Sequence, residues 1–324
     1  MMTLDNYREI VEDHLPSLLE GGSPEELYEP IRYVISLGGK RLRPVIALAA
    51  CDICGGKQED VLHPALGLEV FHNFTLLHDD IMDAAPIRRG APTVHIKWDA
   101  NRAILSGDTM FALAGKLMLQ TKPSCIPAVM SLFFQTATEV CEGQQWDMNF
   151  ETRTDVSTGE YLEMIRLKTA VLLAASLKTG AVIGGARAAL ADRFYRFGLA
   201  CGMAFQLQDD WLDTFGDEAS FGKKTGGDIA ANKKTYLYLR ALELADDHSR
   251  SDLLHWYAQK PEDPTNKIQE VIRIFNSLGM QAEMEKMMDL YRTTALQELD
   301  HIRAEIGGVS VLEAFASAVI RRQQ

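Results

Sequence analysis

The chain has 324 residues, of which 47% are hydrophobic and 24% are charged, and these proportions exclude disordered, collagen-like and low-complexity proteins. It carries 33 Lys and Arg residues against 45 Asp and Glu residues, a formal net charge of −12, and no polybasic stretch. This charge balance argues against nucleic acid as a partner.

Apolar residues recur at helical spacing along almost the whole chain, and segments rich in Gly, Pro and charge separate the resulting helices. In chain order, helices are expected over residues 28–37, 61–82, 103–119, 126–150, 160–179, 188–215, 236–245, 268–278 and 280–306. Breaks are expected over residues 85–93, 121–127, 216–234 and 258–266. No run of alternating β-branched residues predicts a sheet. We therefore expect an all-α fold, and a single domain over residues 1–324, because no break resembles a domain linker.

The sequence also bears on the compartment. No basic region followed by an apolar run begins the chain, so no secretory signal is expected. The most apolar stretch, residues 170–190, contains Lys178, Arg187 and several glycines, and falls short of the ~20 apolar residues of a membrane span. Of the five cysteines only Cys51 and Cys54 have motif spacing, and no second pair completes a zinc site. We expect a cytoplasmic protein with reduced cysteines and no membrane span.

Two segments about 130 residues apart carry the same acidic pattern. The first cluster is Asp79, Asp80 and Asp83, and the second is Asp209, Asp210 and Asp213. In each, the first and third aspartates project from one helix face about one turn apart. Like charges at this spacing repel and Asp is a weak helix former, so the repeated pattern indicates a bound cation. Solvated helix ends are the alternative, but both clusters lie within strongly apolar sequence.

The ligand type indicates which metal these clusters would bind. Carboxylates with no His or Cys at ligand spacing favour Mg²⁺ over zinc or a transition metal. Mg²⁺ held by a few carboxylates keeps several waters and takes further ligands from a substrate phosphate. Two such sites facing one another would grip a diphosphate. A di-iron bundle would need Glu-x-x-His motifs, which the sequence lacks.

Basic residues accompany the acidic clusters. They occur in Gly38-Gly39-Lys40-Arg41-Leu42-Arg43-Pro44, Arg88-Arg89-Gly90, Lys168-Thr169, Gly222-Lys223 and Lys233-Lys234-Thr235. Each group alone would be an ordinary solvated charge. In a protein with a net charge of −12, their recurrence beside the aspartates indicates anion recognition, for which Arg is well suited.

In this order and spacing, GGKRLRP, DDIMD followed by RRG, FQLQDDWLD and a downstream Gly-Lys resemble the motifs of the trans-polyprenyl diphosphate synthases. The resemblance covers nearly the whole chain. It implies an isoprenoid synthase fold of antiparallel helices around a deep central cavity, with a homodimer as the usual assembly. It further implies a Mg²⁺-dependent prenyltransferase that condenses isopentenyl diphosphate with dimethylallyl, geranyl or farnesyl diphosphate.

The resemblance also assigns roles by position. It implies that direct Mg²⁺ ligands are Asp79, Asp83 and Asp209, with Asp80, Asp210 and Asp213 beside them and three ions per site. It implies that the allylic diphosphate is held by Arg88, Lys168, Lys223 and Lys233, and isopentenyl diphosphate by Lys40, Arg43, His72 and Arg89. Thr169 and Gln206 match residues beside the reacting carbons, whereas we interpret His78 as structural.

Product length depends on what closes the cavity below the first cluster. Phe74 lies five residues before Asp79, about 7.5 Å along a helix. An aromatic residue there, with the small Thr75 next to it, resembles short-chain synthases and implies a product of fifteen to twenty carbons. An ideal helix does not place Phe74 directly beneath Asp79, so an ordinary core residue remains the alternative interpretation. Only two residues separate the aspartate pair from Asp83 in this motif, rather than the four of many bacterial farnesyl synthases, which leaves the product class open.

Two other functions are compatible with parts of this pattern. A class I terpene cyclase shares the helical fold and an aspartate motif, but its second metal motif normally has an Asn/Ser/Glu pattern, and it needs no isopentenyl diphosphate site. A regulatory subunit of a heteromeric prenyl synthase would usually have lost one or both aspartate clusters, and both are present here.

Overall fold

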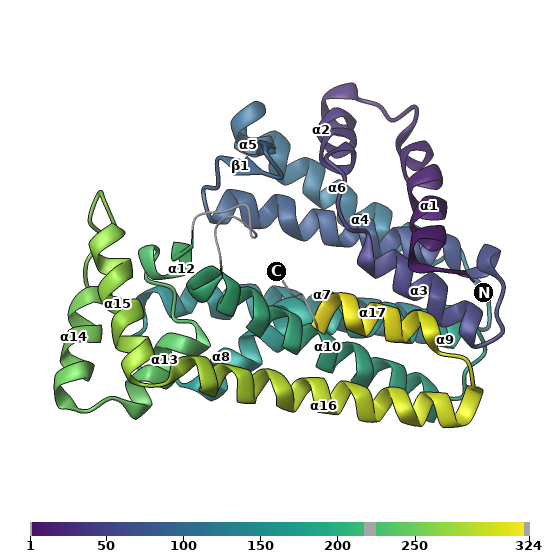
Figure 1. Cartoon of the computed structure of the whole chain (residues 1–324). Helices are drawn as coiled ribbons and strands as arrows, with labels where there is room; N and C mark the ends of the chain where they lie inside the picture. Colours follow the sequence, from purple (N-terminus) through teal and green to yellow (C-terminus); the bar gives the residue numbers. More distant parts are fainter. Residues whose placement is uncertain (1, 217–224, 321–324) are drawn as a thin grey trace. The chain divides into compact units, whose positions relative to one another are not determined.

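The computed structural model describes residues 2–216 and 225–320. Almost all regular structure in these ranges is helical, which confirms the all-α prediction (Figure 1). The chain divides into two compact units, the first made of Met1–Gln135, Ala175–Tyr195 and His301–Phe315, and the second of Thr136–Ala174, Arg196–Asp300 and Ala316–Gln324. That both belong to one domain stays a prediction, and each unit is described by itself.

The elements can be given by unit. Those within the first unit are α1 (Leu4–His14), η1 (Pro16–Leu19), α2 (Glu25–Ser36), α3 (Leu42–Ile53), α4 (Gln58–Met82), β1 (Ile87–Arg88), β2 (Ala91–Pro92), α5 (Val94–Lys97) and α6 (Ala100–Met118). Those within the second are α8 (Thr158–Ile165), η2 (Arg166–Ala170), α12 (Gly227–Ala230), α13 (Tyr236–Leu244), α14 (Asp247–Tyr257) and α15 (Thr265–Ser277). Five helices have residues in both: α7 (Ile126–Thr152), α9 (Val171–Ile183), α10 (Ala188–Phe215), α16 (Met280–Ile306) and α17 (Ser310–Ile320).

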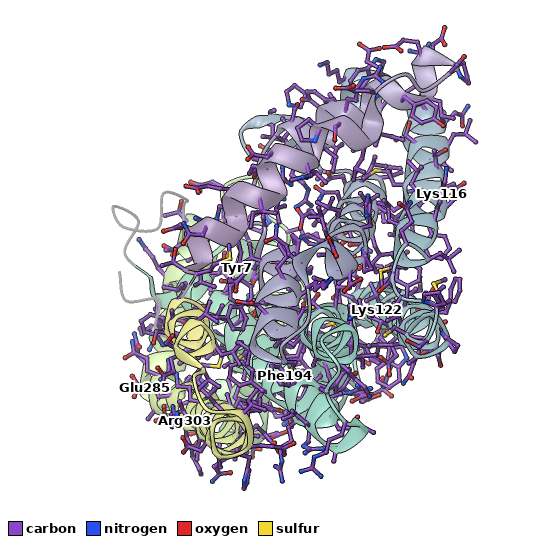
Figure 2. The ribbon with its side chains drawn as sticks, turned by 90° about the vertical axis from the view of Figure 1, so that its right-hand side faces the viewer. Tyr7, Lys116, Lys122, Phe194, Glu285 and Arg303 are labelled. Carbon is purple, nitrogen blue, oxygen red and sulfur yellow. The ribbon has the colours of Figure 1, made fainter. Side chains whose placement is uncertain are left out.

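Helix α4 is the central helix of the first unit. It packs most extensively against α6 and also against α3 and α2. The backbones of α4 and α6 approach closely at Gly67, where a Cβ atom would lie 3.0 Å from the carbonyl oxygen of Ala114. At the start of α4, Asp60 forms an ion pair of 3.0 Å with Lys122, which is labelled in Figure 2. These contacts fix the helix whose last turn carries the first acidic cluster.

A two-stranded hairpin follows α4. Strands β1 and β2 are antiparallel, with Arg88 opposite Ala91. The two residues between them, Arg89 and Gly90, have φ values of +53° and +77°, as a type I′ turn requires. The sequence predicted only an irregular break here, because strands of two residues are too short to show alternation.

The second unit has its own core. Helix α13 packs against α8, and α14 packs against α15 and α13 (Figure 1). Tyr238 of α13 stacks on Tyr257 of α14 with ring centroids 3.7 Å apart. Apolar side chains from α8, α10, α13, α15 and α16 form one buried cluster around them, which includes Leu207, Phe275 and Met284.

Periodicity predicted the long helices well and some shorter ones not at all. Residues 188–215 and 280–306 are helical over the predicted bounds. The predicted continuous helix over 160–179 is instead interrupted by the π-helical η2. Helix α3 was missed because eight of its twelve residues are buried, so no polar face produces a periodic pattern. In the described ranges, no helix has both the length and the apolar character needed to cross a membrane.

Candidate active site

The expected site residues fall into one group in each unit. The first unit contains Lys40, Arg43, His72, Phe74, Asp79, Asp80, Asp83, Arg88 and Arg89. The second contains Lys168, Thr169, Gln206, Asp209, Asp210, Asp213 and Lys233. Lys223 lies outside the described residues.

The first acidic cluster occupies the last turn of α4, with Asp83 as the C-cap. The C-terminal end of a helix dipole disfavours negative charge, so three aspartates there favour a bound cation. The middle carboxylate, Asp80, is buried and accepts a hydrogen bond of 2.7 Å from Arg88 Nε. Burial raises the pKa of Asp80, and the Arg88 guanidinium opposes this rise. Asp79 is half-buried and Asp83 is exposed, so the outer pair is accessible to a metal ion.

The hairpin after α4 contacts the glycine turn before α3. Arg89 Nη1 donates a hydrogen bond to the carbonyl oxygen of Gly38. At Gly39, whose φ is +143°, a Cβ atom would lie 3.0 Å from Arg89 Nη2. Glycine is therefore needed at residue 39 both for its backbone conformation and for the approach of this guanidinium.

The three cations of the GGKRLRP segment have different environments. Arg41 is buried and donates hydrogen bonds to Glu12 Oε1 at 2.9 Å, Glu69 Oε1 at 2.8 Å and the carbonyl oxygen of Ile35 at 2.7 Å. These bonds make Arg41 a structural residue. Lys40 is exposed and Arg43 is half-buried, so these two remain the candidates for anion binding.

Arg43 and His72 lie near other cationic side chains of the first unit. Among the described residues, Arg43 Nε is buried without a hydrogen-bond partner. Burial lowers the pKa of Arg43 to about 10. The nearby Arg89 lowers it further, whereas the negative charge of Glu69 opposes the change. Burial and the nearby Arg43, Arg89 and Arg88 lower the pKa of His72, which keeps its imidazole neutral at pH 7. A bound phosphate would accept a hydrogen bond from this donor and reduce the repulsion among the neighbouring cations.

Phe74 belongs to an aromatic cluster of the first unit. Its ring centroid lies 5.6 Å from that of Phe71, 5.5 Å from that of Phe111 and 4.7 Å from that of His78. Phe133 extends the cluster at 5.4 Å from Phe71. His78 Nε2 also lies 3.2 Å from the carbonyl oxygen of Ile104, which fits the structural role inferred for it.

The second acidic cluster lies in the last two turns of α10. Asp210 is buried and accepts hydrogen bonds from the Tyr161 hydroxyl and, at 3.1 Å, from Gln206 Nε2. Burial and Asp228 raise the pKa of Asp210 to about 8, whereas the Tyr161 and Gln206 hydrogen bonds oppose this rise. Asp213 Oδ2 accepts a hydrogen bond of 2.8 Å from the backbone N–H of Asp228. The middle aspartate is thus the buried one in both clusters.

The π-helical segment η2 carries Lys168 and Thr169, the two residues expected at the substrate. Lys168 Nζ lies 2.6 Å from Asp147 Oδ2 on α7. Glycines allow the close packing of η2, because a Cβ atom at Gly143 would lie 2.5 Å from Lys168 N and one at Gly202 would lie 2.6 Å from Ala170 Cα. π-Helical turns within α-helices occur frequently at functional sites, and here the irregular turn coincides with the residues singled out from the sequence.

The segment before α13 is anchored by a buried lysine that sequence reasoning missed. Lys267 of α15 is 1% exposed and donates hydrogen bonds to Asn232 Oδ1 and, at 3.0 Å, to the carbonyl oxygen of Gln259. Asn232 has a φ of +60° and directly precedes Lys233. Lys233 is largely exposed, with Nζ 3.4 Å from Asp228 Oδ1.

The described residues contain no group of three or more His, Cys, Asp or Glu side chains arranged to hold a metal ion. This result is compatible with Mg²⁺, which usually takes one or two carboxylates and completes its shell with water and substrate phosphate. The donor set present, carboxylates without His or Cys, has the chemistry that Mg²⁺ prefers.

Residues 24–297 match the family model of the polyprenyl synthetases. The chain belongs to this family. The geranylgeranyl diphosphate synthase of Methanosarcina mazei is 42% identical over 242 residues, which cover 74% of this chain and 75% of that protein. The short chain isoprenyl diphosphate synthase of Methanothermobacter thermautotrophicus is 36% identical over 318 residues, which cover 97% and 93% of the two chains. A crystal structure of a geranylgeranyl pyrophosphate synthase matches with a TM-score of 0.93 at 41% identity, covering 100% of both chains.

These comparisons confirm the family and the prenyltransferase class that the motifs predicted. The polyprenyl synthetase fold here also includes partners that no motif had singled out: Glu69 for Arg41, Asp147 for Lys168, and Tyr161 for Asp210. Each is a single residue within a helix, and the residues around it in the sequence give no signal of its role.

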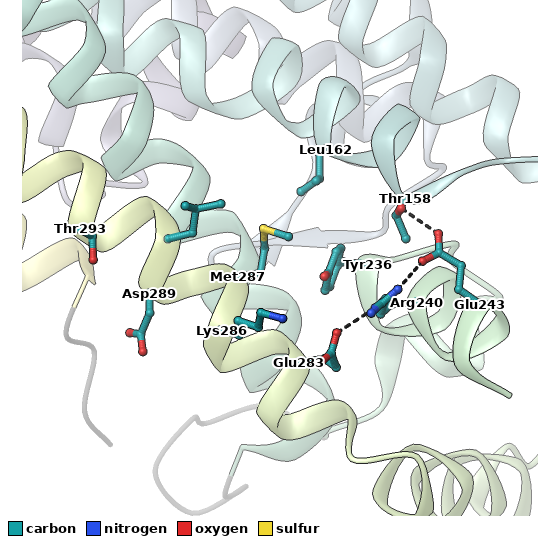
Figure 3. A pocket seen from close by; sticks show the side chains of 11 residues that line it. Thr158, Leu162, Tyr236, Arg240, Glu243, Glu283, Lys286, Met287, Asp289 and Thr293 are labelled. Atoms are coloured by element: carbon teal, nitrogen blue, oxygen red, sulfur yellow. Dashed lines mark hydrogen bonds and ion pairs between the residues drawn. The ribbon is translucent and has the colours of Figure 1, made fainter.

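A cavity of about 600 Å³ opens between α8, α13 and α16 in the second unit (Figure 3). Along its wall Thr158 donates to Glu243, and Arg240 donates to both Glu243 and Glu283, each at 2.8 Å. None of the expected site residues that the structure describes lines this cavity. We therefore do not assign the polyprenyl synthetase chemistry to it.

Proposed function

We propose that the protein condenses isopentenyl diphosphate head-to-tail with an allylic diphosphate, in a Mg²⁺-dependent reaction that yields an all-trans prenyl diphosphate of fifteen to twenty carbons. One repeated observation carries this proposal. In each unit an acidic cluster with a buried, anchored middle aspartate lies on a helix end, and cationic residues accompany it.

The outer aspartates are the proposed metal ligands. Asp79, Asp83 and Asp209 would hold the Mg²⁺ ions, three in all, together with water and substrate diphosphate oxygens. When bound, Mg²⁺ supplies positive charge that stabilises the departing diphosphate. Asp80, Asp210 and Asp213 act beside these ligands, since hydrogen bonds hold them in place.

The cations are the proposed diphosphate ligands. Arg88, Lys168, Lys223 and Lys233 would hold the allylic diphosphate, and Lys40, Arg43, His72 and Arg89 the isopentenyl diphosphate. Support comes from the buried, unsatisfied Arg43 Nε, which can donate a hydrogen bond to a diphosphate oxygen.

The chemical steps follow from charge. Positive groups stabilise the leaving diphosphate as the C1–O bond of the allylic substrate breaks. The double bond of isopentenyl diphosphate then attacks the allylic cation, and loss of one proton to the released diphosphate forms the new double bond. Thr169 and Gln206 are proposed to lie beside the cation, where oxygen lone pairs stabilise positive charge. Apolar surroundings exclude water, which would otherwise capture the cation.

Phe74 is the proposed limit on product length. The aromatic cluster of Phe71, Phe74, Phe111 and Phe133 supports this role, because packing against the rings of Phe71 and Phe111 leaves Phe74 little freedom to move away from a growing chain. The names of the two relatives, a geranylgeranyl and a short chain synthase, agree with a short product.

We further propose that the enzyme is a cytoplasmic homodimer. The exposed apolar side chains of Ile104, Leu105 and Phe134 in the first unit support an association surface.

The test is incubation of the purified chain with Mg²⁺, isopentenyl diphosphate and each of dimethylallyl, geranyl and farnesyl diphosphate, followed by separation of products by length. We expect elongation that EDTA abolishes and a longest major product of fifteen to twenty carbons. A folded protein that elongates none of the three primers would overturn the proposal in favour of a cyclase or a regulatory subunit.

A further inference from the structure

A continuous line of hydrogen bonds in the second unit connects α8, η2 and α10. Thr169 Oγ1 donates to Gln206 Oε1 at 3.0 Å, and Gln206 Nε2 donates to Asp210 Oδ1 at 3.1 Å. The Tyr161 hydroxyl donates to the other oxygen, Asp210 Oδ2. Both Tyr161 and Asp210 are 4% exposed, so water does not compete for these bonds.

The direction of each hydrogen bond follows from the donors and acceptors available. Gln206 Nε2 and the Tyr161 hydroxyl each donate to one oxygen of Asp210, so both carboxyl oxygens act as acceptors and the amide nitrogen of Gln206 faces Asp210. The amide oxygen of Gln206 is thereby turned to Thr169, which must donate its only proton to it. With its proton engaged in this way, the Thr169 hydroxyl presents only its oxygen lone pairs to any other neighbour.

We infer that Tyr161 is a positioning residue for the proposed condensation: by holding Asp210 it fixes the Gln206 amide, and so presents the lone pairs of Thr169, rather than its proton, to the allylic cation. This inference rests on the proposed function. An oxygen lone pair stabilises a developing positive charge, whereas a hydroxyl proton aimed at it is repelled, so the polarity of one hydroxyl affects the rate.

The local backbone explains why such anchoring is needed. Tyr161 precedes the π-helical segment 166–170 and Thr169 lies within it, and both are tied to a single turn of α10 through Asp210 and Gln206. The irregular segment is therefore held at two points. Loss of the Tyr161 hydroxyl would leave Asp210 Oδ2 short of its donor, allowing the carboxylate to rotate and the Gln206 amide to turn with it.

The first experiment compares Tyr161→Phe with the wild type. We expect kcat to fall about tenfold or more, while KM for both substrates stays within about twofold, because the substrate diphosphate ligands are unchanged. Tyr7→Phe is the matched control, since Tyr7 (labelled in Figure 2) is also buried and donates to an aspartate, Asp52 Oδ2, at 2.6 Å in the first unit. Tyr7→Phe should leave kcat unchanged.

A double-mutant cycle tests whether Tyr161 acts through Thr169. If it does, Tyr161→Phe should lower kcat much less in a Thr169→Val background than in the wild type. Replacement of Tyr161 by 4-aminophenylalanine, which keeps a donor at the same place, should restore most of kcat, whereas O-methyltyrosine should not. This last pair also decides the question if Tyr161→Phe does not fold.

The outcomes separate the two proposals. A wild-type protein that elongates no primer overturns the proposed function and this inference with it. An active wild type with an unchanged kcat in Tyr161→Phe, a rise in KM alone, or effects of Tyr161→Phe and Thr169→Val that simply multiply would overturn the role of Tyr161 and leave the condensation standing.

Discussion

The two acidic clusters share one sequence pattern, yet their buried middle aspartates have different kinds of partner. In the first unit Asp80 accepts a hydrogen bond from the charged guanidinium of Arg88, and in the second Asp210 accepts from the neutral Tyr161 and Gln206. A cation offsets the cost of burying a carboxylate more fully than a neutral donor does. Burial is the first cause of a raised pKa at both carboxyls, and together with the nearby Asp228 it raises the pKa of Asp210 to about 8.

The buried cations of the two units differ in the same way. Arg41 in the first unit is held by the carboxylates of Glu69 and Glu12. The described partners of Lys267 in the second unit are the neutral oxygens of Asn232 and Gln259. Among these four buried groups, the two in the first unit are held by opposite charges, and the two in the second are held by hydrogen bonds with neutral groups. This contrast predicts which losses each unit tolerates.

The largest expected effect on kcat comes from the outer aspartates, which both clusters share. Asp83→Asn and Asp209→Asn should each lower kcat about 10³-fold, because both remove a proposed metal ligand. Asp83→Asn should leave the melting temperature unchanged or raised, since it removes negative charge from the C-terminal end of α4. Asp289→Asn, at an exposed aspartate 3.0 Å from Arg292, is the control in kinetic assays. Full activity of Asp209→Asn would show that only the first cluster serves the reaction.

The buried cations test the contrast directly. Arg41→Met leaves the buried Glu69 carboxylate without its cation, and we expect it to lower the free energy of unfolding by about 3–5 kcal/mol. Lys267→Met leaves only neutral acceptors, and we expect a loss of about 1–3 kcal/mol. Denaturant unfolding of both variants measures the difference. Equal losses would mean that the type of partner is immaterial.

The next largest expected effect is a loss of stability and activity when the close backbone packing around η2 is disturbed. Gly143→Ala would force a Cβ atom against Lys168 N, so we expect a loss of about 1–3 kcal/mol in the free energy of unfolding. Displacement of Lys168 and Thr169 should also lower kcat by up to about 10². Gly115→Ala is the control, because its Cβ would come no closer than 3.9 Å to Phe133, and alanine favours helix by about 0.5–1 kcal/mol. Normal kcat in Gly143→Ala would separate the π-helical turn from the chemistry.

Product length is expected to depend on the first unit. Phe74→Ala should shift the products to longer chains, and Phe74→Leu should do so less, because each opens space beside Phe71 and Phe111. Product analysis by chain length measures the shift. Phe194→Leu, at a fully buried residue (labelled in Figure 2) outside the aromatic cluster, should lower stability and leave the product unchanged. An unchanged product spectrum in Phe74→Ala would make Phe74 an ordinary core residue.

The smallest effect is a pH dependence that arises from the cations of the first unit. Burial and Arg43 lower the pKa of His72 in the folded state, so below pH ~6.5 the unfolded chain binds more protons there than the folded one. The contribution of His72 to the free energy of unfolding is therefore present above pH ~6.5. It is lost as the pH falls below this value, by at most about 1.4 kcal/mol per pH unit. His72→Gln should show a flatter decline in unfolding free energy between pH 7 and 5.5. The same decline in unfolding free energy in His72→Gln and the wild type would contradict this role of His72.

The long helices could be predicted because each has a polar face and an apolar face. The bounds of α10 and α16 follow directly from this pattern. Helix α3 could not be predicted in this way, since most of its residues are buried. Nor could the π-helical turn at Lys168, which packs closely against Gly143 and Gly202, two residues outside its own segment of the sequence. Local pattern thus fails where packing with distant segments sets the backbone.

The sequence by itself determined the helical class, the family and the positions of the acidic and basic clusters, because periodicity, charge and motif spacing are properties of the chain alone. Only the tertiary structure decided that Asp80 and Asp210 are the buried members of their clusters and that Arg41 is structural. Burial and hydrogen-bond partners come from residues far along the chain, as Tyr161 does for Asp210 and Glu69 for Arg41. Identical triplets of aspartate therefore acquire different partners when the chain folds around them.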